Sequence, residues 1–303
     1  MNQLKIWIRA LRVPFFSATL VPVLVGSAIA FHAGFFSLNM FLLMLMAALC
    51  VHAGLNLAND YFDHTSGNDE ANTNPTMFSG GSRVIQEKLV TPSEVIIVSS
   101  AFFLIAAVLG LYINQAVAGN AFLWIGIAGL LIAFFYTAPP LRLGYHGLGE
   151  ILTGLGFGML IIVASYLAQT EKLSLNAMLA SIPIAILVAL ILLVNEFHDY
   201  EADKKTKKNN WVVLFGKKSA KNIVILMLVL CFASVLIMMF ARIIPYWSFI
   251  VFLTLPLGFR AAQVINKQYE KRDELLPVNK MIIGLHLAFG LLFALSFVLD
   301  RLL

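Results

Sequence analysis

The stretch Asn56-Leu57-Ala58-Asn59-Asp60-Tyr61-Phe62-Asp63 stands at the end of residues 13–59, which contain no Asp, Glu, Lys or Arg. A run of this length supplies two membrane-spanning helices of about 20 residues each, with a turn expected between His32 and Leu38. The acidic residues that follow are costly near a bilayer and therefore indicate a function. The pattern predicts a helical membrane protein with a polar site at one membrane edge.

The composition supports this class for the whole chain. Of the 303 residues, 60% are hydrophobic and 12% are charged, whereas soluble domains carry about 25% charged residues. The apolar runs are continuous rather than alternating, which favours helices over strands. We therefore expect a single all-α, multi-pass domain over residues 1–303, with about nine transmembrane helices around a central cavity. The remaining spans are expected in residues 95–141 (two helices, with a turn at Asn114–Asn120), 151–169, 174–195, 222–241, 243–260 and 281–299.

The basic residues indicate how the helices are oriented. With the N-terminus in the cytoplasm, all but three of the 21 Lys and Arg residues fall in cytoplasmic segments, the exceptions being Lys172, Arg242 and Arg301. This asymmetry predicts a cell-membrane protein with cytoplasmic active-site loops and an outside C-terminus. The net charge of +5 then reflects orientation and contact with membrane lipids. No compact basic domain is present, so we expect no nucleic acid partner.

The first acidic motif has a second copy. Asn195-Glu196-Phe197-His198-Asp199 resembles Asn59-Asp60-Tyr61-Phe62-Asp63 and also ends an apolar run. Four predicted crossings separate the copies, and an even number places both on one face of the membrane. We therefore predict two pseudo-repeated helix groups, with motifs at residues 56–69 and 195–203. Polar loops are expected from about Asp60 to Ser93 and from about Asp199 to Lys221.

The residue types in these motifs are those of a magnesium site. Residues three or four apart share one helix face, so each motif forms a stripe of carboxylate and amide oxygens. Two facing stripes can hold Mg²⁺, and Mg²⁺ can hold a diphosphate. The alternative is that these acids only cap helices or solvate loop ends, and for Asp69 in particular that it only turns the chain. We predict Asp60, Asp63 and Asp199 as the catalytic acids, and the metal ligands as Asn59, Asp60, Asp63, Asp69, Asn195, Asp199 and Asp203.

Basic residues near the acids are candidates for binding the diphosphate. Arg83 follows Gly80-Gly81-Ser82, where glycine lets the backbone approach an anion. Arg142, Lys204 and Lys208 also lie in predicted cytoplasmic segments and could neutralise a diphosphate. The run Lys204–Lys208 is equally explained as an anchor at the membrane surface.

These features together resemble the UbiA superfamily of intramembrane prenyltransferases, and most closely its menaquinone branch, the 1,4-dihydroxy-2-naphthoate prenyltransferases. The resemblance implies metal ligands at Asn59, Asp63, Asp199 and Asp203, an acid position shared by many members at Asp60, and Tyr136 beside the diphosphate. Gly144 departs from the pattern, because many relatives carry a basic residue there. The segments that carry the resemblance are Leu11-Arg12-Val13-Pro14, Asn56 to Asp63, Tyr136-Thr137-Ala138-Pro139-Pro140-Leu141-Arg142, Gly147-Leu148-Gly149-Glu150 and Asn195 to Asp203.

The resemblance implies a magnesium-dependent transferase. It would move a prenyl group from a polyprenyl diphosphate to an apolar, aromatic acceptor such as a quinone precursor and release diphosphate. Two alternatives remain open. One is an enzyme that makes a lipid ether on a glycerol phosphate. The other is a secondary transporter, although transporters usually place ionisable groups near the membrane midplane rather than at one face.

Overall fold

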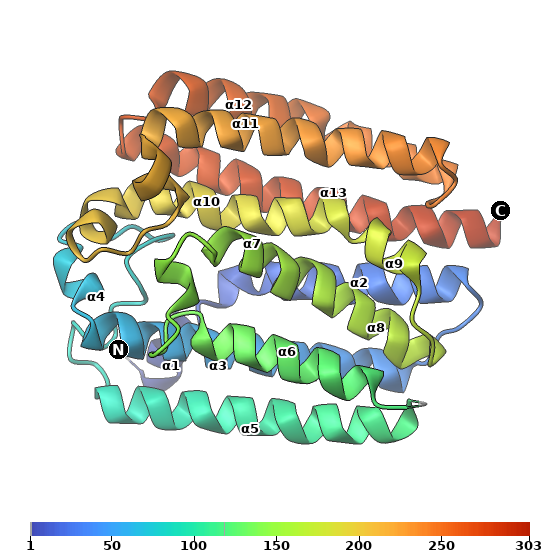
Figure 1. Ribbon diagram of the computed structural model, residues 1–303, viewed down its shortest axis with the longest axis horizontal. Coiled ribbons are helices and arrows are strands. Elements are labelled where there is room, and N and C mark those ends of the chain that lie inside the picture. The colour runs from blue at the N-terminus through green and yellow to red at the C-terminus, as the bar shows by residue number, and fades with distance from the viewer. Residues whose placement is uncertain (1, 118) are drawn as a thin grey trace.

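The fold is known from a computed structural model that describes residues 2–117 and 119–303. Met1 and Ala118, the latter within the predicted turn at Asn114–Asn120, lie outside the described residues. The described part is a bundle of helices that run lengthwise and contains no strand (Figure 1). The helices are α1 (Gln3–Ala10), α2 (Ser17–His32), α3 (Leu38–Thr65), α4 (Asn68–Ala71), α5 (Pro92–Ala116), α6 (Ala121–Phe135), α7 (Gly149–Thr153), α8 (Ile161–Thr170), α9 (Leu175–Ala180), α10 (Ile182–Lys205), α11 (Trp211–Phe240), α12 (Leu255–Gln268) and α13 (Leu276–Leu302).

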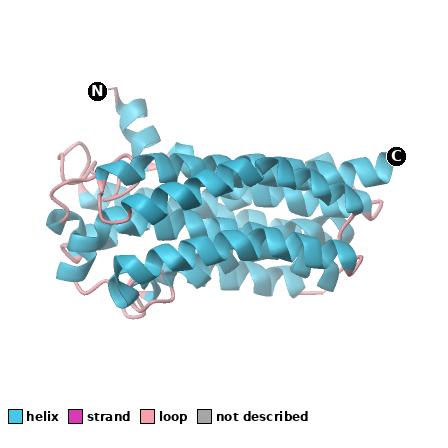
Figure 2. Cartoon of the chain, turned by 90° about the horizontal axis from the view of Figure 1, so that it is seen from above, coloured by secondary structure: helices cyan, strands magenta, loops and turns pink. Residues whose placement is uncertain are grey.

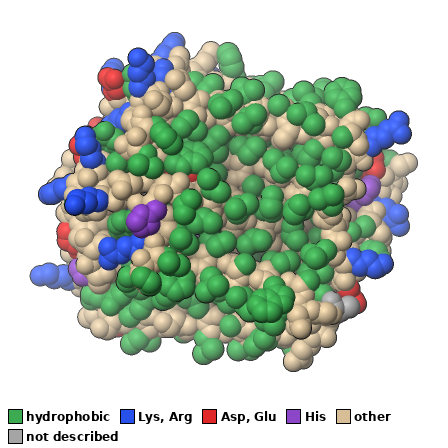
Figure 3. Space-filling view, viewed as in Figure 1, with side chains coloured by type: hydrophobic (Ala, Val, Ile, Leu, Met, Phe, Trp, Pro, Cys, Tyr) green, Lys and Arg blue, Asp and Glu red, His purple; other side chains and the backbone are tan. Residues whose placement is uncertain are grey.

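The number of spans agrees with the prediction of about nine. Within the described residues, eight helical segments are long and apolar enough to cross a membrane, and α6 is a shorter apolar helix. Four of these segments contain turns of another helix type, which are η1 (Val13–Phe16) before α2, η3 (Gly154–Leu160) between α7 and α8, η4 (Tyr246–Thr254) before α12 and η5 (Asp273–Leu275) before α13. Apolar side chains cover the middle of the face seen in Figure 3, and charged side chains gather at its two ends. The chain is therefore a multi-pass membrane protein.

The helices continue further than their apolar segments predict. The loop expected from about Asp199 to Lys221 is much shorter, because α10 runs on to Lys205 and α11 already begins at Trp211. Hydropathy reports where side chains meet the headgroups, whereas backbone hydrogen bonds can continue a helix beyond that depth. The same effect carries α3 through its acidic motif to Thr65. Both acidic motifs are therefore helical, and only residues 206–210 separate α10 from α11.

The bundle is centred on α10, whose Leu187, Leu190 and Leu193 are fully buried. Helix α10 packs along α11 and α13, while α13 packs along α2. On the other side, α3 packs along α5, which forms the outer edge of the bundle in Figure 1. The short helix α1 projects from the bundle at the end opposite the C-terminus (Figure 2).

Glycine permits the closest helix contacts. The segment η3 is a π-helix that continues from α7 into α8, and its Gly154 and Gly158 face Ala185 on α10. A Cβ on Gly154 would lie 2.8 Å from the carbonyl oxygen of Ala185, and one on Gly158 would overlap the Cα of Ala185. Small residues of this kind let membrane helices approach backbone to backbone. This contact places the N-terminal turn of α7 beside the acidic motif of α10.

Candidate functional site

The two acidic motifs meet at one end of the bundle, where α3 and α10 both finish (Figure 1). The short helix α4 bridges them. Asn68 donates a hydrogen bond of 2.9 Å to Asp203, and Asn72 donates one of 2.7 Å to Asp199. Asn68 is the first residue of α4, and Asn72 directly follows its last residue, so the two asparagines stand at opposite ends of the short helix. The loop after the first motif thus contacts the carboxylates of the second.

Asp63 lies where several elements converge. Tyr145 donates to Asp63 Oδ1 over 2.7 Å, while Asn59 and Lys208 donate to Oδ2, each over 3.0 Å. Lys208 comes from the short loop after α10, and Tyr145 from the short turn Leu143–Tyr145. Burial alone lowers the pKa of Lys208, but the carboxylates of Asp63 and Asp203 outweigh that effect and raise the pKa above its usual value. The ammonium group is therefore a fixed positive charge among the acids.

Asp60, three residues before Asp63 on α3, has different partners. It is 2% exposed, and its carboxylate accepts hydrogen bonds from Arg12 and from the backbone and hydroxyl groups of Ser82. Arg12 also donates to Asn59 Oδ1 over 3.1 Å. Asp60 therefore connects Arg12, which follows α1, and the loop at Ser82 to helix α3.

Asp69 is buried at the edge of the same cluster. A Cβ on Gly81 would lie 2.7 Å from Asp69 Oδ2, and the neighbouring Gly80 N–H donates to Asp199 Oδ2 over 3.4 Å. Burial, together with the charges of Asp63 and Asp60, raises the pKa of Asp69 to about 9. The backbone of Gly80 and Gly81 thus lies close to two carboxylates, Asp199 and Asp69, which belong to different motifs.

The predicted diphosphate ligands occupy different places. Arg83 donates to the backbone carbonyl of Asp69, and the guanidinium carbon of Arg142 lies 5.6 Å from the ring centre of Tyr145. Lys204 is exposed and lies 5.6 Å from the ring centre of Tyr200. The structure therefore brings Lys208 rather than Lys204 to the carboxylate of Asp63.

Two further predicted residues face the interior. Tyr136 packs over Gly144 and Gly149, where a Cβ would come within 3.0 Å of its ring carbon Cζ and of its hydroxyl oxygen. A side chain at Gly144 would therefore press against the ring of Tyr136. Asn195 accepts a hydrogen bond of 2.7 Å from Asn279 and, like Tyr136, lines a small cavity.

Sequence reasoning gave no role to several residues of this site, namely Arg12, Tyr145, Asn68 and Asn72, whereas it did name Lys208 as a candidate for the diphosphate. A signal existed for three of them. Arg12 is the last charged residue before the first apolar run, and the spacing of Asn68 and Asn72 matches one helix face. The contact of Tyr145 with Asp63 joins residues far apart in sequence, so no local pattern reports it.

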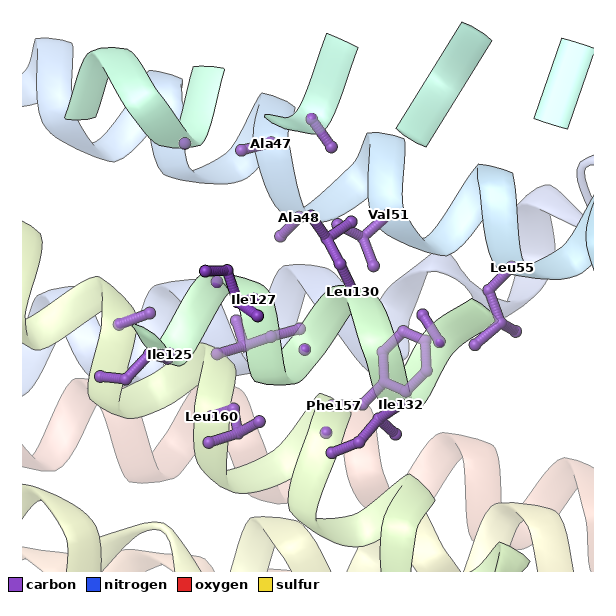
Figure 4. Close-up of a pocket in the computed structure, with 18 of the residues that line it drawn as sticks. Ala47, Ala48, Val51, Leu55, Ile125, Ile127, Leu130, Ile132, Phe157 and Leu160 are labelled. Atoms are coloured by element: carbon purple, nitrogen blue, oxygen red, sulfur yellow. The ribbon is translucent and has the colours of Figure 1, made fainter. Parts of the chain in front are cut away.

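Two cavities adjoin the acidic cluster. The smaller, of about 140 Å³, lies between the two motif helices and is lined by Arg12, His52, Asn59 and Asn195 among others. The larger, of about 320 Å³, is almost entirely apolar and lies between α3, α5, α6 and the η3–α8 segment (Figure 4). Four residues line both cavities, which are Leu55, Tyr136, Thr153 and Phe157. The two cavities therefore adjoin each other, and the smaller one has several polar side chains in a mainly apolar lining.

The donor set fits a hard cation. The side chains around the cluster offer carboxylate, amide and hydroxyl oxygens, and oxygen atoms are the ligands that Mg²⁺ prefers. Within residues 2–117 and 119–303, no three His, Cys, Asp or Glu side chains converge into a closed metal site. Mg²⁺ usually binds through one or two carboxylates and completes its shell with water and phosphate oxygens. The carboxylates here are separate from one another. Each is held by hydrogen bonds from amide groups or by the ammonium of Lys208, and this arrangement agrees with that mode of binding.

Comparisons with known proteins agree with this geometry. The model of the UbiA prenyltransferase family matches residues 19–283. The 1,4-dihydroxy-2-naphthoate octaprenyltransferase of Bacillus subtilis is 30% identical over 82% of this chain and 78% of its own length. The 2-carboxy-1,4-naphthoquinone phytyltransferase of Synechocystis is 28% identical over 97% of this chain and 93% of its own.

The fold has a solved counterpart. A UbiA homolog from Archaeoglobus fulgidus, solved with DMAPP and Mg²⁺, superposes with a TM-score of 0.66 at 17% identity, over 98% of this chain and 99% of that one. Since the family match covers most of the sequence and includes both acidic motifs, this chain belongs to the UbiA prenyltransferase family.

Proposed function

We propose that this protein transfers a prenyl group from a polyprenyl diphosphate to an aromatic acceptor of the 1,4-dihydroxy-2-naphthoate type, with Mg²⁺ as cofactor. The observation that carries the proposal is the meeting of two acidic motifs beside a chamber, formed by the smaller cavity and the apolar cavity that adjoins it. The naphthoate-type acceptor is inferred from the names of two relatives that are similar in sequence.

The diphosphate is assigned to the acidic end of the chamber. Asp63, Asp199 and Asp203 are proposed as the principal metal ligands, with Asn59, Asp69 and Asn195 as further oxygen donors. Bound Mg²⁺ would supply the positive charge that stabilises the leaving diphosphate. Lys208, Arg83 and Arg142 surround the same region and would bind the remaining phosphate oxygens.

Asp60 is assigned a different task. Its carboxylate already accepts hydrogen bonds from Arg12 and Ser82, so it would hold those segments in place rather than meet the metal directly. Tyr136 lines both cavities, and its ring is proposed to lie beside the bond that breaks.

The acceptor is assigned to the small cavity. His52 lies there between the rings of Phe16 and Phe157, at 5.0 and 4.6 Å between ring centres, and its Nδ1 is 2.8 Å from the hydroxyl of Thr19. Arg12 lines the same cavity and supplies positive charge. Aromatic walls with one guanidinium and one imidazole suit a flat aromatic acid, and they keep water away from an allylic cation.

The orientation in the membrane is part of the proposal. The site end of the bundle would face the cytoplasm, because the basic residues concentrate there, and the C-terminus would lie outside. A lipid-ether synthase would share the donor site. The aromatic lining of the small cavity favours a flat acceptor over a glycerol phosphate. A transporter is disfavoured because the carboxylates gather at one end of the bundle.

The experiment is a transfer assay with purified protein, a labelled prenyl diphosphate and a panel of acceptors, with and without Mg²⁺. Asp63→Asn and Asp199→Asn should each lower turnover by roughly a hundredfold or more, because a catalytic metal contributes several kcal/mol. Glu201→Gln, an exposed acid on the same α10, is the matched control and should match the unchanged protein. Equal activity of the Asp variants and the control would refute the metal site. Absence of transfer to every aromatic acceptor would refute the function.

A second variant tests the acceptor site. His52→Phe should raise KM for acceptors that carry a carboxylate while KM for the prenyl diphosphate stays unchanged. The reverse pattern would place His52 at the donor instead.

A further inference from the structure

The start of the last helix, α13, is joined to the second acidic motif by polar side chains. Asn279 lies in the first turn of α13 and is fully buried. Its Nδ2 donates to Asn195 Oδ1 over 2.7 Å, and its Oδ1 lies 2.8 Å from Nε2 of His198. Arg272, just before α13, donates through Nε to the backbone carbonyl of His198 over 3.0 Å. The site therefore has neighbours on a helix that carries neither acidic motif.

The three side chains form a row with one direction. An amide donates at one end and accepts at the other. Asn279 accepts from His198 and donates to Asn195, and this order places the ring proton of His198 on Nε2. The other ring nitrogen, Nδ1, is buried and has no partner among the residues that the structure describes. The hydrogen bonding of the ring is thus directed at Asn279, and the row ends at the oxygen of Asn195.

The direction of the row decides which end of the Asn195 amide stands where. Asn195 lines the small cavity and is one of the oxygen donors proposed for Mg²⁺. Its oxygen carries two lone pairs, of which one accepts from Asn279 and the other is left for a cation. Rotation of the amide by 180° would exchange its oxygen for an N–H group, which cannot bind a cation. Asn279 opposes that rotation, because its own N–H group would then face another N–H group.

A buried polar contact between helices can also serve stability alone. On the same α13, the hydroxyl of Ser296 lies 3.0 Å from that of Ser248, and both residues are fully buried. Ser296 is about 25 Å further along the helix axis than Asn279, toward the end away from the site. Asn279 differs from Ser296 in that its partner lines the small cavity.

We propose that Asn279, held in turn by His198, is a positioning residue that keeps the amide of Asn195 in the orientation able to serve Mg²⁺. The proposal rests on the proposed function and adds to it a residue that touches neither metal nor substrate. Groups that orient a metal ligand typically change metal affinity by about 10- to 100-fold when they are removed.

The test measures Mg²⁺ binding without requiring turnover. Purified protein in detergent is melted at rising Mg²⁺ concentration, with inorganic diphosphate at one fixed concentration. A ligand that binds only the folded state raises the melting temperature, so the Mg²⁺ concentration at half of the rise, the Mg²⁺ midpoint, reports affinity. Asn279→Leu has a similar size but neither donates nor accepts, and it should raise the Mg²⁺ midpoint by about 10- to 100-fold.

Ser296→Ala is the matched control, because it removes a buried hydrogen bond between helices from the same α13. It should lower the melting temperature in EDTA and keep the Mg²⁺ midpoint of the unchanged protein. In the transfer assay, Asn279→Leu should need more Mg²⁺ for half-maximal turnover, and saturating Mg²⁺ should restore most of the turnover. A purely structural role would give Asn279→Leu the behaviour of the control.

Variants of His198 test the direction of the row and do not depend on the folding of Asn279→Leu. His198→Gln keeps an N–H group that can donate to Asn279, whereas His198→Leu does not. His198→Gln should therefore keep the Mg²⁺ midpoint, and His198→Leu should raise it, although less than Asn279→Leu does. Equal midpoints for the two His198 variants would remove His198 from the proposal.

A double variant shows whether Asn279 acts through Asn195. Asn195→Ala and Asn195→Ala combined with Asn279→Leu should share one Mg²⁺ midpoint, because the second change has no amide left to orient. The proposal is overturned if the combined variant binds Mg²⁺ more weakly than Asn195→Ala, or if folded Asn279→Leu keeps the unchanged midpoint. Failure of the proposed function would look different, because the unchanged protein would then show no response to Mg²⁺ and prenylate no acceptor.

Discussion

At the scale of single residues, the acidic cluster is held together in this structure by donors that belong to the protein itself. Amides reach Asp199 and Asp203 from α4, and an ammonium reaches Asp63 from the loop after α10. Buried carboxylates need such partners, because an unpaired buried charge is strongly destabilising. The same groups mark the positions where a cation and a diphosphate would bind.

Lys208 and Lys204 should therefore behave differently, although both belong to one basic run. Lys208→Met removes the ammonium beside Asp63, and loss of one partner of a buried pair typically costs about 3–5 kcal/mol. We expect a lower melting temperature in EDTA, and Mg²⁺ should restore part of it by replacing the lost charge. Lys204→Met, at an exposed position, is the control and should melt like the unchanged protein. If the two variants melt alike, Lys208 does not have this role.

Asp69 should make the stability of the metal-free protein depend on pH. Its pKa is about 9 in the folded protein and about 3.9 in an unfolded chain. A raised pKa contributes stability that is complete below the unfolded value and is lost as pH rises through the folded value. The melting temperature in EDTA should therefore fall between about pH 5 and about pH 9, and it should fall less for Asp69→Asn. Parallel profiles for the two proteins would show that another group is responsible.

At the scale of elements, the contact between η3 and α10 positions both sides of the site. Gly158 allows it, since a Cβ there would overlap the Cα of Ala185. Gly158→Val should therefore destabilise the protein by about 1–3 kcal/mol, the usual cost of overpacking. Gly284→Ala on α13, where a Cβ would meet only Leu257 at 3.8 Å, is the control and should leave stability unchanged or slightly raised. The comparison is made by thermal unfolding in one detergent, and equal melting of both variants would argue against a close helix contact.

The predicted internal repeat also belongs to this scale. Helices α3 and α10 each begin at the end of the bundle away from the site and finish with an acidic motif at the site. That parallel arrangement is what two pseudo-repeated helix groups would require. The repeat itself stays a prediction.

At the scale of the whole molecule, the orientation can be tested with single cysteines in a variant that lacks Cys50 and Cys231. Thr73→Cys and Ser219→Cys lie at exposed positions near the site end, and Glu171→Cys lies exposed near the other end. A membrane-impermeant thiol reagent added to intact cells should modify only the cysteine at position 171. Inverted vesicles should give the opposite pattern. Modification at position 73 in intact cells would reverse the orientation proposed from the basic residues.

The sequence alone determined the class of protein and most of its chemistry. Charge-free runs predicted the spans, because lipid excludes ionised side chains along about 20 residues of helix. The paired motifs predicted where carboxylates gather, since residues three or four apart share a helix face. The motifs also carried the resemblance to the UbiA superfamily, and the family match confirms that resemblance.

Only the tertiary structure decided which residues meet. Asp60 faces Arg12 and Ser82, whereas Asp63 faces Tyr145 and Lys208, although the two acids are neighbours on one helix. Gly158, where a Cβ would overlap Ala185, and Gly110, where a Cβ would meet no atom within 4 Å, are also indistinguishable in the sequence. Their difference depends on which helix lies opposite, and packing among distant segments sets that neighbour. A local pattern reports the face on which a side chain lies, but not the element that the face meets.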